Sequence, residues 1–303
     1  MSGAVALIGG AGFIGRATAR ELERRGALPL VVDRVGDAPL DLTAPDAAAR
    51  LRERLERAGA SVVVHLAARV DPPAGAAEHA AARALHVEGT LAAVRAARAA
   101  GVLRFVLVSS ATVYGAHPDN PVPLDEGAPL RPNDYPYAKD KLAQEELVAR
   151  EATGLSVAVA RPAIVYGPGV RNYLTEIITR APVLPALDGC RPPLQFVHVD
   201  DVARALAELA LTRVDGAFNV APVDWLAADE VARIARKRVV ALPSRVLAPF
   251  LDLGARLLPP HLRAPASLAP YLKHPFVVSA ERLARVTSWA PQVSCAEALR
   301  AIL

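Results

Sequence analysis

The chain has 303 residues, of which 52% are hydrophobic and 22% are charged, and its formal net charge is +4. This length suffices for one large or two small domains with a buried core, and charges of both signs are spread along the chain, so no basic stripe indicates a nucleic-acid surface. The two cysteines, Cys190 and Cys295, lie too far apart in sequence to predict a metal site or a disulfide framework, which favours a cytoplasmic location.

The first two hundred residues alternate short apolar runs with alanine- and arginine-rich segments. The runs with the pattern of buried strands are 4–8, 28–33, 61–67, 103–110 and 155–161. The segments with the pattern of helices are 13–25, 44–58, 77–100 and 136–153. Strands that alternate with helices predict βαβ units, and right-handed crossovers then give an α/β fold with a doubly wound parallel sheet, the Rossmann fold.

The pattern becomes less regular after about residue 165, where proline-rich linkers separate shorter elements. A strand and helix at 194–211, with Asp200 at the N-cap, and a strand at 216–221 are expected to return to the sheet. The apolar stretch at 241–258 contains charged residues and predicts amphipathic helices. No window approaches about 18 uncharged apolar residues, and glycines interrupt the N-terminal apolar run, so we expect neither a membrane span nor a signal peptide.

These patterns divide the chain into two parts. Residues 1–164 and 194–221 are predicted to form the domain that contains the sheet, and residues 165–193 and 222–303 are predicted to form a smaller, discontinuous C-terminal lobe.

A glycine-rich turn joins the first predicted strand to the first predicted helix. Gly9, Gly12 and Gly15 would let the backbone approach a pyrophosphate at the positive end of that helix. Asp33 ends the second strand, near the roughly 20-residue spacing at which a carboxylate binds the adenosine ribose of a dinucleotide. Arg34 beside it leaves NADP as an alternative to the favoured NAD, and a glycine-lined turn without a ligand remains the other interpretation.

The segment NDYPYAKDK, at 133–141, contains the pattern Tyr-x-x-x-Lys in two overlapping registers. Pro136 favours the first position of a helix and keeps the residue before it extended, so Tyr135 is expected outside the helix. Tyr137 and Lys141 then lie one turn apart on one face. We therefore predict Tyr137 and Lys141 as the working pair, and interpret Tyr135 and Lys139 as a loop aromatic and a solvated lysine.

This pair has a chemical use. A free phenol has a pKa near 10, too high for a base at neutral pH. An ammonium about 4 Å away contributes on the order of 4 kcal/mol at an effective dielectric constant of about 20, and so is expected to lower the pKa of Tyr137. Tyr137 would then take a proton from an alcohol, or return one to a ketone.

Seven motifs follow one another along the chain: GGAGFIG, VVD, HLAA, VSSATVYG, YAKDK, RPAIVYGPG and FVHVDDVA. In this order they resemble the extended short-chain dehydrogenase/reductase superfamily, which includes nucleotide-sugar epimerases and dehydratases and 3β-hydroxysteroid dehydrogenase-like enzymes. The resemblance covers most of residues 3–221. It implies an NAD(H)-dependent oxidoreductase that interconverts a secondary alcohol and a ketone on a small-to-medium organic substrate held by the C-terminal lobe.

The resemblance also implies roles for single residues. Ser110 matches the hydroxyl that hydrogen-bonds the reacting oxygen, Tyr137 the acid/base, and Lys141 the residue that holds the nicotinamide ribose. The other positions implied along the cofactor are Gly9, Gly12, Phe13, Ile14, Gly15, Asp33, Arg34, Asp41, Leu42, Ala67, Ala68, Pro162 and Ile164. Members of the superfamily often form homodimers through the helices that correspond to 77–100 and 136–153.

Several positions depart from the superfamily pattern. His86 replaces the usual asparagine and is interpreted as a helix residue rather than a substitute polar contact, and Ala111 and Thr112 replace the Asp-Glu pair of dehydratases. Positions that contact a UDP diphosphate in nucleotide-sugar enzymes are also apolar or neutral, and the late lobe has few charges. A nucleotide-sugar 4-epimerase with the same Ser, Tyr and Lys residues stays the main alternative, followed by a non-catalytic NAD(P)-sensing protein.

The remaining polar and aromatic residues receive structural interpretations. His65, His198 and Asp201 are expected to brace strand ends and helix caps, while Trp225 and Trp289 are expected in the core of the C-terminal lobe. Tyr114 and Tyr166 are assigned with equal weight to pocket lining and to core packing. The acidic segment 143–151 is interpreted as a solvated helix face.

Overall fold

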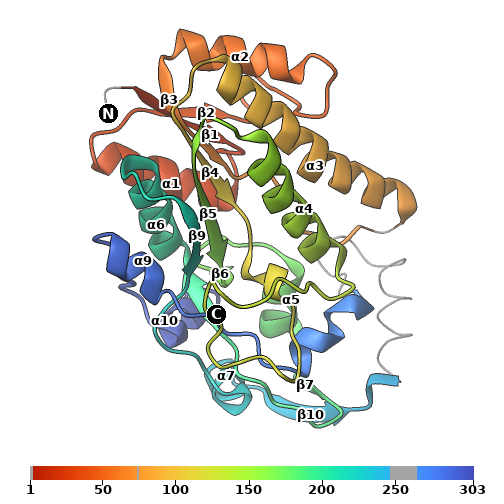
Figure 1. The fold of residues 1–303 in the computed structure, drawn as a ribbon. Coiled ribbons are helices and arrows are strands. Elements are labelled where there is room, and N and C mark those ends of the chain that lie inside the picture. The colour runs from red at the N-terminus through yellow and green to blue at the C-terminus, as the bar shows by residue number, and fades with distance from the viewer. Residues whose placement is uncertain (1–2, 74, 246–264) are drawn as a thin grey trace.

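The computed structural model describes residues 3–73, 75–245 and 265–303 (Figure 1). The part of the stretch 241–258 that begins at residue 246, where amphipathic helices are predicted, lies outside the described residues.

A six-stranded parallel sheet forms the centre of the structure, as predicted. Its strand order is β2-β1-β3-β4-β5-β9. The strands are β1 (Ala4–Ile8), β2 (Pro29–Val32), β3 (Ala60–His65), β4 (Arg104–Val108), β5 (Ser156–Pro162) and β9 (Gly216–Val220). Strand β2 lies on one side of β1, and the next strand in sequence, β3, lies on the other side. The connections therefore run in opposite directions from β1, and the carboxyl ends of β1 and β3 form a topological switch point.

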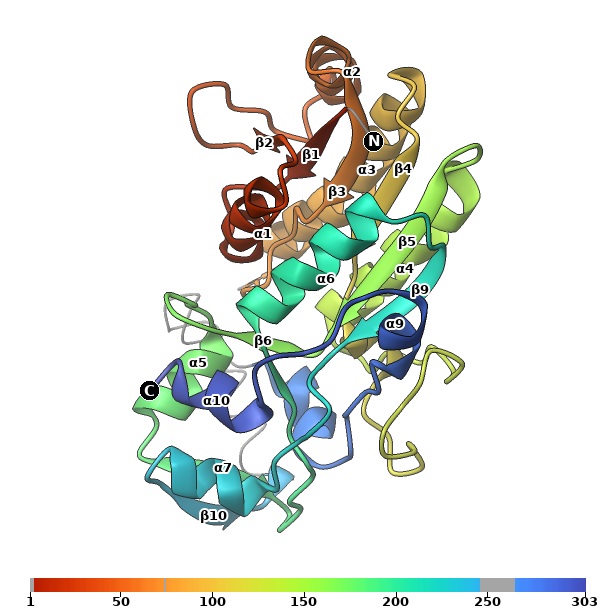
Figure 2. The ribbon, with the colours of Figure 1, turned by 90° about the vertical axis from the view of Figure 1, so that its left-hand side faces the viewer.

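Helices cover both faces of this sheet (Figures 1 and 2). On one face lie α1 (Phe13–Arg24) and α6 (Val199–Leu211), and on the other lie α2 (Ala47–Arg57), α3 (Ala76–Ala99) and α4 (Pro136–Glu151). Side chains alternate between the faces along each strand. In β1, Val5 and Leu7 belong to the core cluster that includes α6 residues, whereas Ala6 and Ile8 belong to the cluster that includes residues of α2, α3 and α4.

Smaller elements form the lower part of the molecule in Figure 1. Two two-stranded parallel sheets pair β6 (Ile164–Tyr166) with β8 (Phe196–His198), and β7 (Val183–Leu187) with β10 (Arg238–Leu242). The helical elements are η1 (Ala111–Tyr114), α5 (Tyr173–Arg180), α7 (Ala228–Ile234), η3 (Ala266–Leu272), α9 (Glu281–Val286) and α10 (Cys295–Arg300). The expectation that the strand before α6 returns to the central sheet is wrong, because β8 pairs with β6 instead.

Two further expectations need correction. The N-cap of α6 is His198, whose side chain accepts a hydrogen bond from the Asp200 amide, so Asp200 itself lies inside the first turn. Trp225 is 37% exposed rather than buried. Trp289 is buried, but in the core cluster of the central sheet, where it lies with Leu283. The predicted boundaries between the two parts of the chain stay a prediction.

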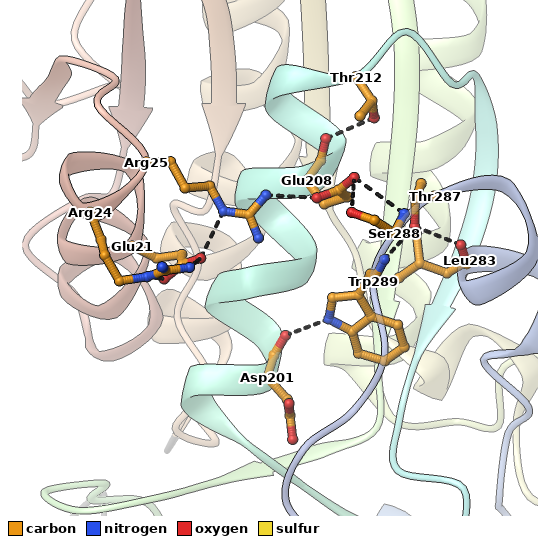
Figure 3. Close-up of polar contacts among 10 residues, drawn as sticks. All are labelled: Glu21, Arg24, Arg25, Asp201, Glu208, Thr212, Leu283, Thr287, Ser288 and Trp289. Atoms are coloured by element: carbon orange, nitrogen blue, oxygen red, sulfur yellow. Dashed lines mark hydrogen bonds and ion pairs between the residues drawn. The ribbon is translucent and has the colours of Figure 1, made fainter.

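The C-terminal segment is attached to α6 by buried polar contacts (Figure 3). The Asp201 carboxylate accepts hydrogen bonds from the amides of Gln292, at 2.8 Å, and Val293, at 3.0 Å, and it also pairs with Arg204. The indole of Trp289 donates to the Asp201 carbonyl at 3.0 Å. Asp201 is fully buried, which confirms its predicted structural role.

The other end of α6 joins the same segment to α1. Glu208 pairs with Arg25, the C-cap of α1, at 2.6 Å and accepts a hydrogen bond from the Ser288 hydroxyl at 3.1 Å (Figure 3). Arg25 also pairs with Glu21, so one chain of charges links two helices and the C-terminal segment. In the described part of the chain, no helix is long and apolar enough to cross a membrane.

Removal of the Asp201 carboxylate should destabilise the whole fold. We expect Asp201→Ala to lower the free energy of unfolding by about 3–5 kcal/mol, because it removes two charge-assisted hydrogen bonds from a fully buried carboxylate and leaves the amides of Gln292 and Val293 without this acceptor. The neighbouring Asp200 is 57% exposed, so Asp200→Ala should change it by only about 0.5 kcal/mol or less. Urea unfolding of both variants measures the difference, and equal losses would contradict the bracing role of Asp201.

Candidate active site

One continuous cavity of about 1430 Å³ opens at the carboxyl ends of the central strands. Every residue that the sequence marks as catalytic or cofactor-binding lines it: Gly9, Gly12, Phe13, Ile14, Gly15, Asp33, Arg34, Asp41, Leu42, Ala67, Ala68, Ser110, Tyr137, Lys141, Pro162 and Ile164. The structure therefore brings these residues together on one cavity.

The glycine turn brings two backbones together at the switch point. Gly9 has a φ angle of +86°, and a Cβ atom there would lie 2.6 Å from the Ala67 amide nitrogen. A Cβ atom at Gly15 would lie 2.6 Å from the backbone of Gly10. Gly12 is the N-cap of α1 and has no side chain to cap it, so the first amides of this helix are open to an anion. This geometry fits the pyrophosphate of a dinucleotide.

Asp33 organises the turn as well as lining the cavity. Its carboxylate accepts hydrogen bonds from the amide of Ala11, at 3.0 Å, and from the amide of Arg34, at 2.7 Å. Each carboxylate oxygen has a further lone pair, so the group can still accept hydrogen bonds from a ribose. Farther along, Asp41 bonds the amide and hydroxyl of Thr43, and the Thr43 amide bond lowers the pKa of the Asp41 carboxyl.

The register of the Tyr-x-x-x-Lys pair agrees with the sequence prediction. Helix α4 begins at Pro136, and Tyr135 precedes it with an extended backbone. Lys139 is exposed and pairs with Asp134, as expected of a solvated lysine. Tyr135, however, is more than a loop aromatic, because it is only 4% exposed and its ring lies 5.8 Å from that of Tyr137.

The Lys141 ammonium is held at the end of β4. Its Nζ atom donates to the Val108 carbonyl at 2.8 Å and lies 5.6 Å from the centroid of the Tyr137 ring. Burial lowers the pKa of Lys141 to about 8, although Glu145 and Asp140 oppose this effect. Burial and, to a lesser extent, Tyr135 raise the pKa of Tyr137 above its usual value. The expected lowering by Lys141 is therefore wrong for the free protein, and the phenol keeps its proton at neutral pH.

Ser110 is positioned two residues after the carbonyl that binds Lys141. It caps the short helix η1, where its Oγ atom accepts hydrogen bonds from the Thr112 amide, at 3.2 Å, and the Thr112 hydroxyl, at 3.0 Å. Because these contacts use its lone pairs, the Ser110 hydroxyl hydrogen is left to donate to an oxygen atom in the cavity.

A buried ion pair lies on the same face of α4 as Tyr137 and Lys141. Glu145 pairs with Arg161 of β5 at 2.6 Å and accepts a hydrogen bond from the Ser109 hydroxyl. Arg161 also donates to the Tyr114 hydroxyl, which donates to Asn219 of β9. Both members of the ion pair are less than a tenth exposed.

Sequence reasoning missed this ion pair, because it interpreted 143–151 as a solvated face. A signal was present: Tyr137, Lys141 and Glu145 follow one another at the same four-residue spacing, so Glu145 shares their inward face. Tyr114 is a fully buried residue within this network, which settles its place in favour of the core.

His86 belongs to a second buried network. Its Nε2 atom accepts a hydrogen bond from the Arg69 amide at 3.0 Å, and its Nδ1 atom lies 2.9 Å from Asp140 of α4. Burial lowers the pKa of His86, which is consistent with a neutral ring that donates from Nδ1. The ring contacts that of Tyr137 edge to face at 5.9 Å. The interpretation of His86 as an ordinary helix residue is therefore wrong.

The contacts of His65, at the end of β3, confirm its predicted structural role. Its Nε2 atom hydrogen-bonds the Thr90 hydroxyl at 2.9 Å, and the same hydroxyl accepts from Gln144 of α4 at 2.7 Å. Burial lowers the pKa of His65 to about 3, so the ring is neutral. Together the two networks join α3 to α4 behind the cavity.

The comparison with known proteins agrees with this site. A model of the NAD dependent epimerase/dehydratase family matches residues 5–221. Ceramide reductase of Caulobacter vibrioides is 31% identical over 84% of this chain and 77% of its own length. The dTDP-glucose 4,6-dehydratase of Streptomyces griseus is 34% identical over 65% of this chain and 66% of its own length. The chain spans about half to three quarters of the length of the curated relatives that it matches.

A solved structure of a similar protein contains NAD. MoeE5, in complex with UDP-glucuronic acid and NAD, is 26% identical, with a TM-score of 0.74, and the match covers 99% of this chain and 97% of that one. The open helix terminus, the close-packed glycines and the carboxylate of Asp33 fit the same dinucleotide here. This chain is an enzyme of the NAD-dependent epimerase/dehydratase family, and its cofactor is NAD.

Proposed function

We propose that the protein interconverts a ketone and a secondary alcohol with NAD(H), and that its residues are set for the reduction. The observation that carries this proposal is the meeting of Ser110, Tyr137 and Lys141 on one cavity that also holds the dinucleotide turn. In the reduction, NADH supplies a hydride to the carbonyl carbon.

The chain supplies the proton and its control. Ser110 donates a hydrogen bond to the carbonyl oxygen, and Tyr137 gives that oxygen its proton as the hydride arrives, so that one hydride and one proton convert the ketone to the alcohol. Burial raises the pKa of Tyr137, so the phenol is protonated at neutral pH and is available as the donor. We assign Lys141 to the nicotinamide ribose and to the reprotonation of Tyr137 after turnover.

A nucleotide-sugar 4-epimerase is the second candidate, supported by the similarity to MoeE5, whose structure contains the nucleotide sugar UDP-glucuronic acid with NAD. The same Ser, Tyr and Lys residues serve both reactions, so the distinction depends on what the remaining cavity binds. A dehydratase is a weaker candidate, because Ala111 and Thr112 stand where an acid and a base are needed. Ala111 is also only 1% exposed, which leaves it no access to a substrate.

Tyr135 and Tyr137, which are separated by Pro136, provide a matched pair of variants. We expect Tyr137→Phe to lower the rate of NADH-dependent ketone reduction by at least about 100-fold, because it removes the proton donor, with little change in NADH affinity. Tyr135→Phe removes the same atom two residues away and should retain most of the activity. Stopped-flow absorbance of NADH measures both. A larger loss in Tyr135→Phe would show that the assignment of the donor is wrong.

The pH dependence should report Lys141. Its pKa of about 8 in the folded protein means that the ammonium is present below that pH and is lost above it. We therefore expect kcat/KM for ketone reduction to be constant from neutral pH to about 8 and then to fall tenfold per pH unit. Lys141→Met should lower the plateau and abolish this break, whereas an unchanged break in that variant would assign the titration to another group.

A further inference from the structure

The part of the cavity beyond Tyr137 has an apolar wall. We call it the distal half, and it is lined by Leu174, Ile177, Leu184, Leu268, Leu272 and Phe276. Leu174 and Ile177 come from α5, and Leu268 comes from η3. These three residues pack in one cluster with Tyr135 and Tyr137, so the wall reaches the proposed proton donor.

Charge is scarce on this wall. Among the described residues from 162 to 276 that line the cavity, Arg171 is the one Lys, Arg, Asp or Glu side chain, and it is exposed. A nucleoside diphosphate carries at least two negative charges, and proteins bind such groups with several charge-assisted hydrogen bonds. Burial of a phosphate against leucine and isoleucine would instead cost desolvation without compensation.

Most neutral polar side chains on the wall are already engaged. Asn172 caps α5, Gln195 donates to backbone carbonyls and accepts from a backbone amide, and the Tyr271 hydroxyl donates to the Thr112 carbonyl. The Tyr166 hydroxyl is an exception, because it is buried without a hydrogen-bond partner among the described residues. It is one neutral hydrogen-bonding site, which suits an uncharged polar group and offers no charge to a phosphate.

We propose that the distal half binds an uncharged, hydrocarbon-rich molecule, so that the substrate is a ketone or secondary alcohol with a long or bulky apolar body. The reaction at its polar end rests on the proposed function, whereas the binding of the apolar body does not. Apolar atoms that leave water for this wall contribute binding free energy in proportion to the area that they bury.

A ladder of methyl ketones, from hexanone to dodecanone, tests this proposal without turnover. Each ketone is titrated into the full-length protein loaded with NAD⁺, which cannot supply a hydride, and its dissociation constant is measured by calorimetry. We expect affinity to rise about fourfold per added methylene until the wall is covered. UDP and UDP-glucose, titrated in the same way, should show no binding in the micromolar range. An affinity that does not change with ketone chain length, or micromolar binding of UDP-glucose, would overturn the proposal.

Variants locate the binding on the wall. Ile177→Asp places a charge beside the hydrocarbon and should weaken dodecanone binding by at least about tenfold, with NAD⁺ affinity unchanged. Val223→Asp is the matched control, because Val223 is 85% exposed and does not line the cavity. If Ile177→Asp fails to fold, Ile177→Ala should still lower the affinity for dodecanone by about tenfold. Equal effects in the variant and its control would contradict the assignment.

The same ketones, given with NADH, separate this proposal from the proposed function. A rising ladder of affinities without hydride transfer would contradict the reductase and leave the apolar site intact. Hydride transfer to short ketones at rates independent of chain length would support the reductase and overturn the apolar site.

Discussion

The buried ion pair between Glu145 and Arg161 is the contact on which the geometry of the site depends. It joins α4 to β5. Glu145 also accepts a hydrogen bond from Ser109, which directly follows β4, so the end of that strand is connected to the same pair. Burial lowers the pKa of Arg161, but Glu145 outweighs this effect and the pKa is raised, so Arg161 stays charged. Removal of one partner from such a pair typically costs about 3–5 kcal/mol, because the other charge is left buried alone. The orientation of α4, and with it Tyr137 and Lys141, therefore rests on a contact that no substrate touches.

Polar residues thus support one side of the cavity while apolar residues form the other. His86 of α3 pairs with Asp140 of α4 and contacts the Tyr137 ring edge to face, and a strand carbonyl holds Lys141. In front, Leu268 packs against the same helix. Burial in this setting raises the pKa of Tyr137 and lowers the pKa of Lys141, so the two pKa values, which are similar in the free side chains, move apart. This separation favours proton transfer from the ammonium of Lys141 to a phenolate at Tyr137.

The sheet and the cofactor turn were predictable from sequence because their signals are local. Strand alternation, the glycine spacing and Pro136 each act within a few residues, and the structure agrees with all of them. The errors share a different cause. Glu145 and His86 resemble surface helix residues until partners 16 and 54 residues away, Arg161 and Asp140, are placed beside them. The pairing of β8 with β6 likewise depends on long-range packing that hydrophobic periodicity does not encode.

The parts that could be predicted from sequence and the parts that could not have different functions in the molecule. Dinucleotide binding requires that the backbone at the end of a strand comes close to the ligand. Few sequences allow this, so the glycine pattern can be recognised in the sequence. An apolar wall needs only bulk and shape, which many sequences satisfy, so α5 and η3 carry no motif. Yet Leu174, Ile177 and Leu268 pack directly on the cluster that contains Tyr137. In the proposed reaction, the substrate body and the proton donor therefore share one packing unit, and a substrate that fills the wall would also immobilise the phenol. Under these two proposals, selection of the substrate and positioning for proton transfer are the same physical event.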